Sequence, residues 1–181
     1  MKKLAAVMFT GVAFMMSTPA YSQAKVEVTW QNPDKYTDVR PSNESRTRFK
    51  ERTFKVLEEY LVELAEVLPD DQTLKITVTN LDLAGQVWPA SFVGLGQSAS
   101  DVRLIKRIDI PRIAFNYELL NSNGEIFKQG EQNLKDMSFQ DRHNPFFSSE
   151  NLRYEKNMLR MWFEDQFRQE IEASKPATTT G

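Results

Sequence analysis

Residues 102–134 read VRLIKRIDIPRIAFNYELLNSNGEIFKQGEQNL, two extended runs joined by the polar sequence NSNG. In the first run, apolar side chains recur at every second position: Ile113, Phe115, Tyr117 and Leu119. A period of two places them on one face of a β-strand. The Asn-Gly pair at 123–124 supplies the positive φ angles of a tight turn. The stretch therefore predicts a long β-hairpin at the centre of a small sheet, with the more polar residues 125–134 as an outer strand.

The apolar alternation changes parity inside the first run. Before Pro111, the alternating apolar residues carry even numbers: Val102, Leu104, Ile108 and Ile110. Proline cannot donate to a strand ladder and is confined to edges, strand starts and bulges. We therefore expect a bulge or break at Pro111-Arg112 that lets both halves of the run face one core.

The first 24 residues have the pattern of a secretory signal peptide. Lys2 and Lys3 precede a short apolar run, and small residues follow it. The run is shorter than the roughly 20 residues that cross a bilayer, so we expect no transmembrane anchor in the mature form. Cleavage after Ala24, or alternatively after Ser22, would leave one domain over 25–172 and a flexible tail over 173–181. The expected location is the periplasm.

Composition excludes several kinds of chemistry. The chain has no cysteine, which excludes disulfides, thiolate metal sites and cysteine nucleophiles. Without Lys2 and Lys3 it carries 21 basic against 25 acidic residues, so no nucleic-acid partner is expected. His143 is the only histidine and has no evident acid-base partner. We expect no cofactor, no metal site and no catalytic residue.

The remaining elements follow from periodicity. Residues 25–30 and 74–81 alternate as strands, and a helix is expected from Ser42 or Ser45 to about Leu68, where Pro69 stops it. A last helix is expected to start at Ser148 or Ser149. Its apolar residues occupy most of its circumference, which indicates either burial on more than one side or a part left for a partner subunit. The order β-α-β-β-β-α predicts an α+β fold of two layers: about four strands in a mixed or mostly antiparallel sheet, with two long helices.

Charges on the first helix are arranged against its macrodipole. Basic residues fill its first half and glutamates its second half, whereas the dipole favours the reverse order by about 0.3–1 kcal/mol per terminal charge. Two interpretations stay open: a solvated face with local ion pairs, or an end that contacts anions. The basic residues concerned are Arg46, Arg48, Lys50, Arg52 and Lys55.

A long irregular stretch, residues 82–101, is rich in glycine yet contains apolar side chains. Loops of this length are often functional. Trp88 and Phe92 either fold back over the sheet or form the lip of a binding site. With Arg103 and His143 they are our candidate binding residues, although a lone histidine in a polar loop also suits a surface or capping role.

Four stretches together carry a family resemblance: KVEVTWQNPDKYTDVR, LDLAG, IDIPRIAFNYELLNSNGE and NLRYEKNMLRMWF. With them, residues 25–167 resemble the exported proteobacterial family known as domain of unknown function 3016. The resemblance implies a single secreted domain of the cell envelope. It transfers no activity, cofactor or catalytic residue.

Three functions remain open from the sequence. The first is non-enzymatic binding of an envelope component, with an envelope protein or a second copy of the chain as partner. The second is a carboxylate-dependent envelope hydrolase, which requires two carboxylates about 5–10 Å apart in a cleft. Its candidates are Asp34, Asp38, Asp82, Asp101, Asp136 and Asp141. The third is a carrier of a small apolar ligand, which requires a closed apolar pocket beneath residues 82–101.

Overall fold

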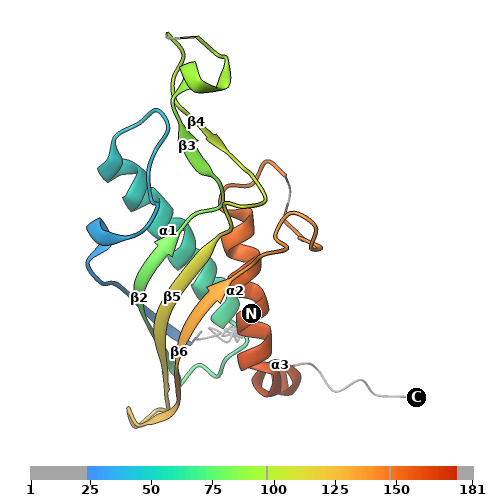
Figure 1. The fold of residues 1–181 in the computed structure, drawn as a ribbon. Helices are drawn as coiled ribbons and strands as arrows, with labels where there is room; N and C mark the ends of the chain where they lie inside the picture. Colours follow the sequence, from blue (N-terminus) through green and yellow to red (C-terminus); the bar gives the residue numbers. More distant parts are fainter. Residues whose placement is uncertain (1–23, 97, 147, 175–181) are drawn as a thin grey trace, which may run out of the picture.

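The computed structural model describes residues 24–96, 98–146 and 148–174. A four-stranded sheet is covered on one face by two long helices, and a small two-stranded ribbon projects from one end (Figure 1). The elements are β1 (Lys25–Trp30), η1 (Pro33–Lys35), α1 (Arg46–Ala65), β2 (Thr73–Asp82), β3 (Gln86–Trp88), η2 (Ala90–Val93), β4 (Val102–Leu104), β5 (Arg112–Leu120), β6 (Ile126–Lys135), α2 (Arg153–Gln166) and α3 (Arg168–Ser174). The predicted α+β class and the order of its main elements are confirmed. The predicted signal peptide lies outside the described residues except for Ala24, as does the predicted tail from residue 175.

The sheet is mixed, with strand order β1-β2-β5-β6. β1 runs parallel to β2, a pairing that needs a long crossover, and α1 supplies it. The pairs β2-β5 and β5-β6 are antiparallel. β6 is therefore an edge strand, as its polar sequence predicts. Its more apolar neighbour β5 is central.

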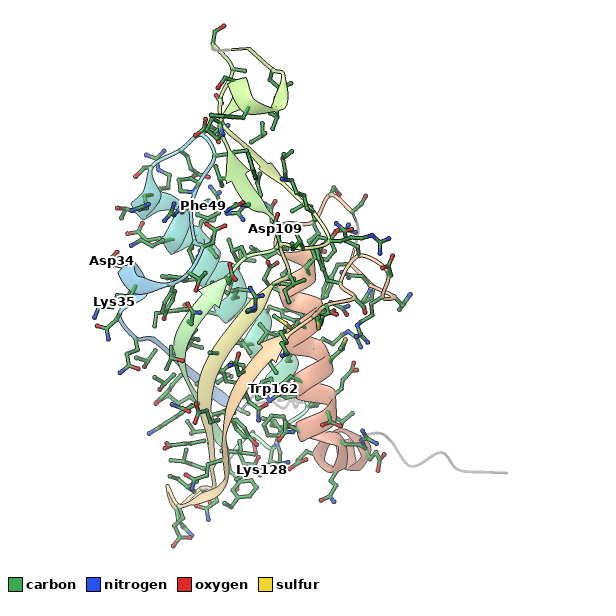
Figure 2. The ribbon with its side chains drawn as sticks, viewed as in Figure 1. Asp34, Lys35, Phe49, Asp109, Lys128 and Trp162 are labelled. Carbon is green, nitrogen blue, oxygen red and sulfur yellow. The ribbon has the colours of Figure 1, made fainter. Side chains whose placement is uncertain are left out.

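The core lies between the sheet and the helices. Alternate residues of β2 and β5 point to it, and α1 and α2 turn one apolar face each towards it. Trp162 lies on α2 (Figure 2). The centroid of its ring is 4.7 Å from that of Phe115 and 5.4 Å from that of Tyr117, in edge-to-face geometry. Burial of these rings stabilises the fold by about 25 cal/mol per Å² of apolar surface.

The hairpin β5-β6 is confirmed, but its turn is not the two-residue type. Gly124 N–H donates to the carbonyl of Asn121, and Gly124 alone has positive φ, at 78°. The register then shifts opposite Leu120, which leaves one extra residue on β6. This is a turn followed by a glycine bulge, in which Asn123 does not need a left-handed conformation.

The expectation that residues 102–110 continue the hairpin into the same core is wrong. A break at Pro111 is present, since β5 begins at Arg112. Residues before it form β4, which pairs with β3 in the separate ribbon. Ile108, expected to face the core, is 81% exposed. Alternation reports the pleat of a strand, not the sheet to which the strand belongs.

The helix boundaries differ from the predicted ones mainly at α2. α1 follows Ser45, one of the two expected caps. α2 begins only at Arg153, because Leu152 has φ 58°, a left-handed conformation that a right-handed helix cannot contain. It ends at Gln166, and α3 follows after Phe167.

Candidate functional site

A cavity of about 330 Å³ opens at the end of the molecule where the ribbon leaves the sheet. Its walls come from residues 40–56, 83–84, 103–105 and 148–155. Phe49 marks the α1 wall in Figure 2. Both long helices begin at this end and run along the sheet in the same direction (Figure 1). We call this cavity the arginine pocket, after four of its lining residues: Arg40, Arg52, Arg103 and Arg153.

Arg103 holds one wall of the arginine pocket together. Its guanidinium donates to the Asp38 carboxylate at 2.9 Å, to the carbonyls of Ala84 and Gly85, and to the carbonyl of Arg40 at 2.9 Å. These acceptors belong to the segment before α1 and to the turn between β2 and β3. Arg103 thus fastens the root of the ribbon to the body, and four protein acceptors engage its donors.

Glu155 forms the floor on the α2 side. Its side chain is buried, and its Oε1 accepts a hydrogen bond from the Ala84 N–H at 2.7 Å. Burial raises the pKa of this carboxyl, while the Ala84 N–H and the charge of Arg103 act in the opposite direction. The bond joins α2 to the same β2–β3 turn that Arg103 holds. Sequence reasoning missed Glu155, because a glutamate in the first turn of a helix has the pattern of a solvated residue.

The apolar part of the wall is substantial. It consists of side chains from α1, from the residues that follow β2 and β4, and from the start of α2 and the residue before it: Phe49, Val56, Leu83, Ile105, Leu152 and Tyr154. The pocket is thus mixed and open, not the closed apolar cavity that a carrier of purely apolar ligands requires.

A second cavity, of about 310 Å³, lies on the other side of the Arg103 contacts. It brings together Asp38 and Asp82, two of the six candidate carboxylates. Asp82 pairs with Arg112 at 2.7 Å, and Asp38 pairs with Arg103. Burial raises the pKa of Asp82, the bond from Arg112 lowers it, and the nearby Asp38 charge raises it. Both carboxylates are therefore held in ion pairs.

The other candidate carboxylates do not join this pair. Asp34 pairs with Lys50 and Asp141 with Arg107 at exposed positions, and the buried Asp136 pairs with Arg142. Asp101 is exposed beside β4. Among the described residues, no group of three or more acidic or histidine side chains is arranged to hold a metal ion.

The candidate binding residues from the sequence lie in three places. Trp88 and Phe92 are on the ribbon, outside the lining of both cavities; Trp88 is half-buried under the Lys106 ammonium, 3.9 Å from the ring centroid, and Phe92 is 77% exposed. Arg103 lies in the wall of the arginine pocket. His143 is exposed in the segment before α2. Of these four residues, only Arg103 lines either of the two cavities described above.

Arg40 and Arg153 were not among the candidate residues, because nothing in their local sequence sets them apart. The one usable signal was the basic first half of α1, since Arg52 on that half lines the pocket.

The family comparison agrees with the resemblance noted in the sequence. The model of the family described as "Protein of unknown function (DUF3016)" matches residues 24–165. The chain belongs to this family. The match to DUF3016 spans the whole sheet, α1 and almost all of α2, so the arginine pocket lies entirely within the family domain. No curated protein and no solved structure matches the chain.

In the part of this DUF3016 chain that the structure describes, no helix has the length and apolar character of a membrane span.

Proposed function

We propose that this protein is exported by its N-terminal segment and acts in the periplasm as a non-enzymatic binding protein, with the arginine pocket holding an envelope component. The arginine pocket carries the proposal. It combines cationic and apolar walls in about 330 Å³, at the lower end of the roughly 300–1,000 Å³ of small-ligand sites. Export is supported by the basic and apolar pattern of residues 1–24 and by a family match that begins at residue 24.

Retention on immobilised envelope extract tests the binding. The full chain is expressed in a Gram-negative host, recovered from the periplasmic fraction, and passed over the extract. Val56 lines the pocket, so Val56→Trp should fill it and abolish retention. Val62 is on the same helix, is 39% exposed and lies outside the pocket lining, so Val62→Trp should leave retention unchanged. Equal retention of both variants, or no retention of the wild type, would overturn the proposal.

Export has its own test. Mass spectrometry of the mature chain from the periplasmic fraction should show a new N-terminus at Lys25 or Gln23. Recovery of the uncleaved chain from the cytoplasm would contradict export.

A carboxylate-dependent hydrolase is the second candidate, because Asp38 and Asp82 line one cavity and burial raises the pKa of Asp82. It is the weaker one, because a guanidinium engages each carboxylate. Release of soluble fragments from purified cell-wall glycan, lost on Asp82→Asn, would favour it over binding. Absence of release by the wild-type chain would eliminate it.

A further inference from the structure

The charged side chains of the arginine pocket that no carboxylate or backbone group engages are cationic. Its two acidic residues are already engaged: Glu150 pairs with Lys156 at 2.5 Å, and Glu155 accepts from the Ala84 N–H. Two of its four arginines are engaged as well, Arg103 by the contacts given above and Arg52 by a two-pronged pair with Glu44.

Arg40 and Arg153 are the other two arginines of the pocket. Neither guanidinium pairs with a carboxylate among the described residues. Arg153 stacks on the ring of Tyr154, with 4.4 Å from its central carbon to the ring centroid, and donates to the Tyr154 hydroxyl. The Arg40 side chain is exposed, and only the Arg40 carbonyl is held by the wall. Guanidinium groups at the rim of a cavity match carboxylate and phosphate oxygens in geometry and in charge.

The helices add to the positive potential at this end. Residues from the first turns of α1 and of α2 line the pocket, so the positive ends of both macrodipoles point towards it. The first turn of α1 contains Arg46 and Arg48 and its last turn contains Glu63, the reverse of the charge order that stabilises a helix. An anion at this end would offset that unfavourable arrangement.

The cavity also limits the size and shape of its occupant. At about 330 Å³ it is at the lower end of the roughly 300–1,000 Å³ of small-ligand sites, which suits a small molecule. Phe49, Val56 and Ile105 provide an apolar surface beside the charged rim. A fully polar anion would leave that surface without a partner.

We propose that the arginine pocket binds a small amphipathic anion, with a carboxylate or phosphate group held by Arg40 and Arg153 and a short hydrocarbon part against Phe49, Val56 and Ile105. This inference names the class of ligand for the proposed binding function, and it rests on that function.

Isothermal titration calorimetry on the exported full chain tests the class with probes of matched length. Octanoate and octyl phosphate represent the two head groups; octanol lacks the charge, octyltrimethylammonium reverses it, and inorganic phosphate lacks the hydrocarbon. At least one of the two octyl anions should bind, and that anion should bind about tenfold or more tightly than octanol and than inorganic phosphate. Which head group is preferred identifies the carboxylate or phosphate source. Failure of both octyl anions, or equal affinity for octanol, would overturn the proposal.

A matched pair of double variants locates the binding. Arg40→Gln with Arg153→Gln removes two charges from the pocket. Arg46→Gln with Arg48→Gln removes two charges from exposed positions on α1 that do not line it. The first pair should weaken binding about tenfold or more and the second less than about threefold. Equal losses would show attraction by general charge and would refute the site.

The outcomes separate this inference from the function beneath it. If the octyl anions do not bind but Val56→Trp abolishes retention on envelope extract, the pocket remains the binding site and the anionic ligand class is wrong. If Val56→Trp leaves retention unchanged while the octyl anions bind at Arg40 and Arg153, the ligand class stands and the envelope component is held elsewhere.

Discussion

Replacing Arg103 by methionine tests whether this side chain holds the ribbon to the body or contacts a ligand. Methionine keeps much of the aliphatic stem and removes the guanidinium. The substitution leaves the Asp38 carboxylate without its partner. It also leaves the backbone carbonyls of Ala84, Gly85 and Arg40 without the donor that the structure shows. It also removes a positive charge that favours the ionised form of Glu155.

The expected loss follows from burial. The side chains of Arg103 and Asp38 are 19% and 14% exposed. Removing one partner of a fully buried pair costs about 3–5 kcal/mol. Because water reaches part of this pair, we expect Arg103→Met to lower the free energy of unfolding by about 2–4 kcal/mol. The double variant Arg103→Met with Asp38→Asn leaves no orphan carboxylate and should recover more than about 1 kcal/mol.

Urea unfolding followed by tryptophan fluorescence at pH 7 measures these differences. Arg107→Met is the matched control, because Arg107 and its partner Asp141 are 73% and 56% exposed. Breaking that surface pair should cost less than about 1 kcal/mol. If Arg103→Met is no more destabilising than Arg107→Met and instead loses octanoate binding, Arg103 is a ligand contact and its structural role is refuted.

Three further predictions concern stability. Because burial raises the pKa of Glu155 above its ordinary value of 4.5, the folded protein retains a proton that the unfolded chain releases, and its stability falls as pH rises from that value. Glu155→Gln removes this effect, so in urea titrations the stability of the variant relative to wild type should increase as the pH rises above 4.5. A stability difference between the two proteins that does not depend on pH would contradict the burial argument. Gly85→Ala should destabilise the protein more than Gly94→Ala. Both glycines have φ near 80°, but only the methyl group added at position 85 would meet backbone, 2.4 Å from a carbonyl oxygen. Equal melting temperatures of the two variants would disprove the clash. Phe115→Ala should cost about 3–5 kcal/mol in the same urea assay, because its ring is 1% exposed, and a loss under 1 kcal/mol would place the core elsewhere.

The sequence predicted those parts of the fold that depend on local pattern. β1 matches its predicted range, and β2 extends the predicted strand by one residue at each end. β5 and β6 follow from alternation and from the glycine turn. The ribbon was missed because β3 and β4 have three residues each, too few for a period to show, and pair across a glycine-rich loop.

The candidate site was predicted less well because it is built from distant segments. Arg40, Arg103 and Arg153 lie fifty or more residues apart from one another along the chain, and the turn at Leu152 that shortens α2 leaves no composition signal. Of the two interpretations of residues 82–101, a binding lip finds no support in the cavities described, since neither Trp88 nor Phe92 lines them, and Phe92 does not fold back over the sheet because it is 77% exposed on the ribbon. The basic first half of α1 was the one sequence feature that indicated the end of the molecule where the arginine pocket lies.

The most direct test of the arginine pocket is an NMR titration of the exported chain with octanoate and octyl phosphate, followed through arginine side-chain Nε–H resonances. Binding in the pocket predicts saturable shifts at Arg40 and Arg153, with Arg46 and Arg48 unmoved at the same ligand concentration. Shifts of all four arginines that increase in proportion to ligand without saturation, or no shifts at Arg40 and Arg153, would contradict it.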